Sequence, residues 1–213
     1  MKSFSKLFCI FLTSVLCSCD VTYYYDVTSY ILEYVRVDGV RLRGDDASRF
    51  DFSISGRRVE FRSVGEDAVL YDSLCRANND IGYSENVGLF IDVIMDRIAY
   101  YPYIVSIDMF SDMDFDAEHP AGSSLGDIVS LSYRTASDYI ESRYRTMDPV
   151  KYNKIRKLSE ITEKDLRLLI SGFDIGPAYF EKSPDNPGEY NMTIRLTLAN
   201  GEVYEDTRLF RFE

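Results

Sequence analysis

The chain has 213 residues, of which 35 are acidic and 24 are basic, so its formal net charge at neutral pH is −11. A surface with this excess of negative charge repels nucleic acid and anionic lipid headgroups, which argues against either as a partner. A hydrophobic content of 46 % is normal for a globular domain and argues against a disordered stalk.

The first residues have the pattern of a secretory signal. Lys2 and Lys6 supply positive charge, and an apolar run follows over residues 7–16. This run is too short to cross a bilayer, since a spanning helix needs about 20 apolar residues. No later apolar run in the sequence is longer, so we expect the segment to be cleaved and nothing else to cross the membrane.

The expected cleavage site resembles the lipobox of bacterial lipoproteins. Residues 16–19 read Leu-Cys-Ser-Cys, which places a small serine directly before Cys19. We expect residues 1–18 to be a lipoprotein signal peptide and Cys19 to be acylated, because two or more acyl chains anchor a protein firmly. Residues 19–28 would form a tether, and residues 29–213 a single β-rich globular domain. The alternative is ordinary secretion with a chance cysteine at the boundary.

Cleavage and acylation change the charge and the cysteine count. Removing Lys2 and Lys6 leaves 22 basic residues against 35 acidic ones, a net charge near −13. Of the four cysteines only Cys75 remains free, so no intramolecular disulfide can form. Its apolar neighbour Leu74 favours a small buried hydrophobe over a catalytic thiol.

Strand-forming residues recur along the first half of the chain. Segments rich in β-branched and aromatic residues, bounded by Gly, Asn, Asp or Pro, predict strands at 30–37, 57–64, 87–95 and 101–110. The dipeptide Asp38-Gly39 between apolar neighbours predicts a tight turn.

The clearest predicted element is a C-terminal hairpin. Apolar and polar residues alternate from Tyr190 to Leu198, which gives the strand one buried face. Asn200-Gly201 predicts a type I′ turn. The expected cross-strand pairs are Leu198 with Val203, Met192 with Leu209, and the oppositely charged Arg195 with Asp206.

One short helix is predicted at 163–171. Residues 162–165 resemble a capping box, and Gly172 stands where a glycine often ends a helix. Residues 135–157 fit either another helix or a long loop, and residues 183–188 are a loop. Together the elements predict a mainly β fold, an immunoglobulin-like β-sandwich with a short helical excursion before the C-terminal hairpin.

Residues 122–126, Gly-Ser-Ser-Leu-Gly, fit the nucleophile elbow of α/β-hydrolases, with Ser124 as the nucleophile. That motif requires a strand running into the first glycine and a histidine downstream. The single histidine of the chain, His119, lies upstream. A turn capped by Ser124 and Asp127 accounts for the same residues. A hydrolase that uses Ser124 or a carboxylate pair is therefore the enzymatic alternative.

An acidic run has the spacing that projects alternate carboxylates toward a cation. Its residues are Asp112, Asp114, Asp116 and Glu118. A calcium loop of the EF-hand kind needs Gly and Glu where this chain has Ala117 and Ser123. The four acids are therefore candidate Ca²⁺ ligands in another geometry, and a solvated acidic turn is the alternative. His119 alone cannot form a zinc site.

Two resemblances point to one group of bacteria. Residues 72–74, Asp-Ser-Leu, resemble the O-glycosylation acceptor of exported Bacteroidetes proteins, with Ser73 as the modified residue. The chain also resembles a family of uncharacterised Bacteroidetes lipoproteins of similar length. The resemblance rests on the lipobox, the closing hairpin, residues 107–115 (Ile-Asp-Met-Phe-Ser-Asp-Met-Asp-Phe) and residues 119–127 (His-Pro-Ala-Gly-Ser-Ser-Leu-Gly-Asp). The resemblance implies an envelope location and a mainly β fold, and it implies no activity.

The residues behind Cys19 bear on the location within the envelope. Surface-exported lipoproteins of that phylum carry an acidic run there, whereas Asp20 is followed by Val-Thr-Tyr-Tyr-Tyr. We therefore expect a lipid anchor in the outer membrane, facing the periplasm.

The motifs contain no convincing catalytic set. This favours a non-enzymatic binding or assembly module that presents sandwich loops to a protein or glycan partner and needs no cofactor. The alternatives are the hydrolase and a Ca²⁺-stabilised structural domain.

Overall fold

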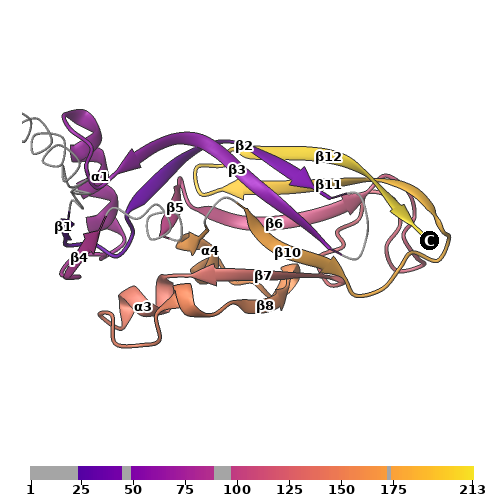
Figure 1. The fold of residues 1–213 in the computed structure, drawn as a ribbon. Helices are drawn as coiled ribbons and strands as arrows, with labels where there is room; N and C mark the ends of the chain where they lie inside the picture. Colours follow the sequence, from indigo (N-terminus) through magenta and orange to yellow (C-terminus); the bar gives the residue numbers. More distant parts are fainter. Residues whose placement is uncertain (1–23, 45–48, 89–96, 172–173) are drawn as a thin grey trace, which may run out of the picture.

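Strands are the main secondary structure of the chain that the structure describes. The computed structural model describes residues 24–44, 49–88, 97–171 and 174–213, so the predicted signal at 1–18 and Cys19 lie outside it. Figure 1 shows sheets that run along one long axis. Strands β1 (Tyr24–Val27) and β4 (Glu85–Gly88) lie with helix α1 (Glu66–Ala77) at one end, and the C-terminus lies at the other.

The remaining elements follow in chain order. The strands are β2 (Glu33–Arg43), β3 (Phe50–Glu60), β5 (Ile98–Tyr101), β6 (Ile104–Ser111), β7 (Val129–Thr135), β8 (Lys154–Lys157), β9 (Leu169–Ile170), β10 (Ile175–Phe180), β11 (Gly188–Leu198) and β12 (Val203–Phe212). The helices are α3 (Ser137–Glu141) and α4 (Glu163–Arg167), with 3-10 turns η1 (Pro149–Lys151) and η2 (Leu158–Glu160). None of the described helices is long and apolar enough to cross a membrane.

Two sheets enclose the main core. Within the described residues the larger sheet has the order β5-β2-β3-β10-β7-β8, with β9 also paired to β7, and the smaller has the order β12-β11-β6. Strands β1 and β4 pair separately. The β2–β5 pair is parallel, and the pairs around it are antiparallel (Figure 1).

The core forms because β11 buries every second side chain. Its buried residues are Tyr190, Met192, Ile194, Leu196 and Leu198. They pack in one cluster with Phe52 of β3, Met109 of β6 and Leu131 of β7. Each such side chain contributes about 1.5–3 kcal/mol when it leaves water. The predicted mainly β class and the sandwich are confirmed, and the immunoglobulin-like subclass stays a prediction.

The turn of the C-terminal hairpin differs from the predicted one. The backbone N–H of Leu198 donates to the carbonyl of Glu202 at 2.9 Å, so the loop comprises residues 199–201. Gly201 has φ +85°, the left-handed conformation that ends a three-residue hairpin loop. The predicted type I′ turn is therefore wrong, because Asn-Gly also suits this longer loop.

The longer loop shifts the strand register by one residue. The observed pairs are Thr197 with Val203, Met192 with Arg208, and Arg195 with Glu205. The exposed charge pair therefore exists, but Arg195 bonds Glu205 instead of Asp206.

Asp206 closes an open edge of β2 instead. Strand β5 pairs only with residues 33–36, and no described strand pairs with the second half of β2 at this edge. The carboxylate of Asp206 accepts the N–H of Leu42 at 2.7 Å, and the guanidinium of Arg208 donates to the Leu42 carbonyl at 3.1 Å. Two side chains of β12 thus take the place of a neighbouring strand.

Asp38-Gly39 is a bulge inside β2 and not the predicted turn. Val37 pairs with Gly56 and Gly39 pairs with Ser55, so one extra residue sits on β2. A side chain at Gly56 would meet the carbonyl oxygen of Arg36 at 1.8 Å, so glycine is required at this close approach. The bulge bends β2 and β3 together.

The helices are shorter than predicted. Thr162 caps α4 by accepting the N–H of Asp165 at 3.2 Å, which confirms the capping residue. The helix ends at Arg167, and residues 169–170 form β9 against β7, so the predicted span to 171 is wrong. Gly172 lies outside the described residues.

Other elements depart from the predicted positions. Residues 135–157 contain α3, η1 and β8, while α1 was not predicted. The predicted strand at 101–110 is divided between β5 and β6, and most of the one at 87–95 lies outside the described residues.

We expect Asp206→Ala to lower the free energy of unfolding by about 1–2 kcal/mol, because it leaves the N–H of Leu42 without its acceptor. Urea denaturation measures the loss. Asp206→Asn keeps an acceptor oxygen and should retain most of the stability. Equal losses in both variants would contradict the proposed edge closure.

Candidate functional site

The acidic residues predicted to bind Ca²⁺ close the loop between β6 and β7. The carboxylate of Asp112 accepts the backbone and side-chain N–H groups of Asn191 at 2.8 and 2.7 Å. Asp114 accepts the N–H of Ala121 at 2.8 Å. Among the residues that the structure describes, no group of three or more His, Cys, Asp or Glu is arranged to hold a metal ion. The protein itself therefore occupies oxygens that a cation would need.

Asp116 is the centre of a charged cluster in this loop. One of its oxygens accepts the N–H groups of Glu118 and His119 at 2.8 and 3.0 Å, and it also contacts the imidazole Nδ1 at 2.8 Å. The other oxygen lies 2.6 Å from the ammonium of Lys182. On the far side of the ring, His119 Nε2 lies 2.9 Å from Asp127.

The two carboxylates favour the cationic form of the buried imidazole. Burial lowers the pKa of His119, but the bonds to Asp116 and Asp127 outweigh it and raise the pKa above the ordinary 6.5. For Asp116, burial alone would raise the pKa. The bonds from Lys182 and His119 outweigh this effect and leave the pKa of Asp116 well below its usual range. With both ring nitrogens engaged, His119 braces the loop and is not available as a general base.

Ser124 lies outside this cluster. Its exposed hydroxyl donates to Asp108 at 2.9 Å and accepts the N–H of Gly126 at 3.1 Å. Ser124 forms an isolated antiparallel β-bridge with Phe110, and β6 already ends at Ser111. No strand therefore runs into Gly122. The nucleophile elbow that the G-x-S-x-G spacing predicts is therefore not formed, and Ser124 caps a turn.

The two predicted features of residues 72–75 lie on α1. Ser73 is exposed, and its hydroxyl donates to the Leu70 carbonyl at 2.7 Å, so its glycosylation stays a prediction. Cys75 is buried, and burial raises the pKa of its thiol to about 11. Its predicted role as a small buried hydrophobe is confirmed.

A cavity of about 510 Å³ lies between α3, the loop 142–149 and β8. The sequence patterns did not indicate this site. Its lining includes Asp138, Tyr139, Glu141, Tyr152 and Lys154. The cavity thus combines aromatic rings with charged groups of both signs.

Lysines neutralise the cavity carboxylates. Lys154 Nζ lies 3.1 Å from Asp138 and 2.8 Å from Asp165, and Lys164 Nζ lies 2.9 Å from Asp138 and 2.7 Å from Glu141. The bonds from Lys164 and Lys154 lower the pKa of Asp138. The Asp138 carboxylate is therefore ionised at neutral pH, with one lysine on each of its oxygens.

Buried groups fix the loop 142–149 that walls the cavity. Tyr144 donates its hydroxyl to Asp80 at 2.9 Å, and Tyr30 donates its hydroxyl to Asp148 at 2.6 Å. Asp80 is fully buried and also accepts the backbone N–H groups of Tyr30 and Ile31 at 2.8 Å each. Burial raises the pKa of Asp80, and these donors oppose the rise. The wall is therefore formed before any ligand arrives.

The segment that contains this loop and β8 is rich in basic side chains. Residues 143–157 contain six basic side chains, namely Arg143, Arg145, Lys151, Lys154, Arg156 and Lys157, and one acidic side chain, Asp148. The net charge of the whole chain conceals this basic segment. A count of charge in short windows would have found it.

Comparison of the chain with protein families, curated proteins and solved structures gives no match.

We expect His119→Gln to cost most stability at mildly acidic pH. Because the folded-state pKa of His119 lies above 6.5, its contribution is complete below that pH and is lost as the pH rises through the folded value. The difference in unfolding free energy from wild type should therefore shrink as the pH rises above 6.5 and through the raised folded-state pKa. Urea denaturation across this range measures it. A pH-independent difference, or an NMR pKa at or below 6.5 for the single histidine, would contradict the stabilisation of His119 by Asp116 and Asp127.

We expect millimolar Ca²⁺ to leave the melting temperature unchanged, because Asp112, Asp114 and Asp116 already accept bonds within the protein. Differential scanning fluorimetry with Ca²⁺ and with a chelator measures the effect. A rise in melting temperature that Asp114→Asn abolishes would show instead that the loop binds the ion.

Proposed function

We propose that this chain is a non-enzymatic binding module of the cell envelope, held in the outer membrane by lipid on Cys19 and facing the periplasm. The lipobox pattern and the resemblance to Bacteroidetes lipoproteins support the anchor. The ligand site is the cavity between α3, the loop 142–149 and β8, and the ligand is an envelope glycan.

The arrangement around Tyr152 is the observation that carries this function. Tyr152 is 47 % exposed and lines a cavity that Asp138, Glu141 and Lys154 also line. The apolar C–H face of a sugar ring packs on an aromatic side chain, while carboxylates and ammonium groups bond its hydroxyls. A concave site with aromatic walls and a few fixed polar groups is the usual form of a small-ligand site.

The charge state of the cavity favours binding over hydrolysis. A glycosidase needs a carboxylic acid whose pKa is raised so that it can protonate the leaving group. In this cavity the lysines shift the pKa of Asp138 in the opposite direction. Asp138 is therefore suited to accept hydrogen bonds and not to donate a proton.

We expect Tyr152→Ala to weaken glycan binding by about fivefold or more, since a stacked ring contributes about 1 kcal/mol or more. An array of bacterial envelope oligosaccharides, followed by calorimetry on the bound members, measures the change. Tyr179→Ala is the matched control, because Tyr179 is a half-buried tyrosine of β10 that does not line the cavity.

Three results would overturn the proposal. They are equal affinity of wild-type and Tyr152→Ala proteins, failure of the folded wild-type protein to bind any oligosaccharide of the array, and cleavage of a bound oligosaccharide.

A further inference from the structure

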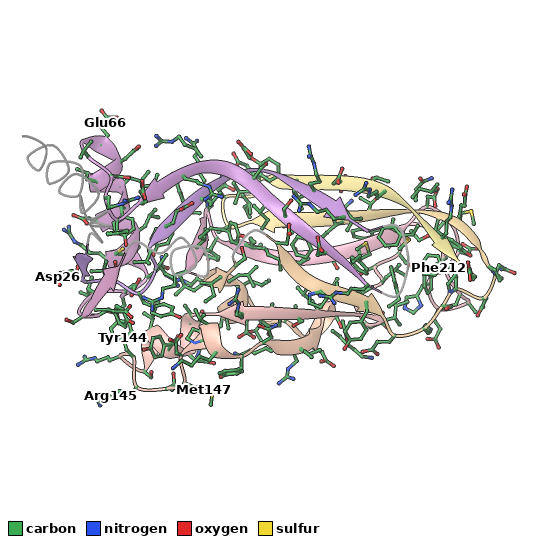
Figure 2. The ribbon with its side chains drawn as sticks, viewed as in Figure 1. Asp26, Glu66, Tyr144, Arg145, Met147 and Phe212 are labelled. Atoms are coloured by element: carbon green, nitrogen blue, oxygen red, sulfur yellow. The ribbon has the colours of Figure 1, made fainter. Side chains whose placement is uncertain are left out.

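The loop that walls the cavity ends in an exposed tip. Arg145 and Thr146 are exposed, and Met147 is 63 % exposed. Figure 2 shows Arg145 and Met147 at the outer edge of the molecule, below α3. We refer to residues 145–147 as the tip.

Bonds on both sides hold the tip in this outward position. Before it, Tyr144 is tied to the buried Asp80, and after it, Asp148 is tied to Tyr30. The hydroxyl of Ser142 accepts the N–H groups of the first two tip residues at 3.1 and 3.2 Å. The fixed backbone keeps the Met147 side chain exposed beside the cavity, which it lines together with Thr146. Its exposed, flexible thioether side chain can therefore contact an apolar surface outside the molecule.

Exposed cationic side chains lie in the tip and beside it. Arg143, Arg145 and Lys151 are exposed, and none of them forms an ion pair with a residue that the structure describes. An exposed methionine flanked by unpaired cations is complementary to a surface with anionic headgroups over an apolar interior.

The opposite end of the molecule has the reverse character. Residues 108–127 contain six acidic side chains and no lysine or arginine. In Figure 1 this loop lies at the end that carries the C-terminus. Lys182 pairs with one of these acids, and the loop remains net negative. An anionic surface therefore repels this loop.

The start of the described chain lies near the tip. Figure 2 shows Asp26 of β1 and Arg145 at the same end, opposite Phe212. Five residue steps separate Cys19 from Tyr24, the first residue of β1, and they span at most about 18 Å. A lipid on Cys19 would therefore hold this end close to the bilayer.

We propose that the tip and its neighbouring cations dock on the anionic phospholipid surface of the membrane that holds Cys19. This inference rests on the lipid anchor of the proposed function. Docking fixes the orientation of the domain: the cavity lies close to the membrane, and the acidic loop points away from it.

Site-directed fluorescence quenching on the acylated, vesicle-bound protein tests the docking. Met147→Cys carries the label at the tip, and Met113→Cys is the matched control at the far end, where the native methionine is 43 % exposed. Cys75 is buried and does not compete for the label. The vesicles are phosphatidylcholine with or without phosphatidylglycerol, and both contain a lipid-borne quencher.

We expect quenching at position 147 to exceed that at position 113 several-fold in vesicles with phosphatidylglycerol. The difference should shrink in neutral vesicles, at high salt, and when Arg143→Gln and Lys151→Gln are added.

Three results would overturn the docking, and they can be told apart. Equal quenching at both positions, with mass spectrometry showing lipid on Cys19, overturns docking alone. Absence of that lipid overturns the anchor and the docking with it. Protection of the tip label by a soluble anionic glycan, with no quenching by vesicles, overturns the membrane as the occupant.

Discussion

The buried carboxylate of Asp80 joins three parts of the structure that are far apart in the chain. It accepts the N–H groups of Tyr30 and Ile31 at the start of the sheet and the hydroxyl of Tyr144 in the loop 142–149. A buried carboxylate without such donors would be strongly unfavourable. The end of the sheet, the cavity wall and the exposed tip therefore form as one unit, and loss of one contact weakens the others.

Acidic residues serve different purposes at the two ends of the molecule. At the end that carries the C-terminus, Asp112 and Asp116 close a loop, and His119 and Lys182 both bond to Asp116. Near α3, lysines bridge Asp138 but leave it at the wall of an open cavity. The spacing of acids in the sequence does not distinguish these roles, because only their surroundings decide whether an oxygen remains available.

Local patterns predicted the local structure. The alternation along β11 and the cap at Thr162 were both read correctly, because each depends on residues within a few positions of one another. The hairpin register failed because Asn200-Gly201 suits two loop lengths. Helix α1 gave a weak signal, since only Tyr71 and Cys75 of its residues are buried.

The cavity could not be predicted in the same way. Its wall depends on the bond between Tyr30 and Asp148, which are 118 positions apart. No short-range pattern records such a contact. The positive charge of residues 143–157 was visible in the sequence, but averaging over the whole chain concealed it.

The closure of β2 by Asp206 and Arg208 has a consequence for crowding. Proteins confined to a membrane meet their own copies far more often than proteins in free solution do. An open strand edge under those conditions recruits a strand from a neighbouring molecule and starts aggregation. At Leu42 both backbone groups are already occupied by side chains of the same chain. This part of the edge offers no template, so copies brought together by the proposed lipid anchor would not join edge to edge there.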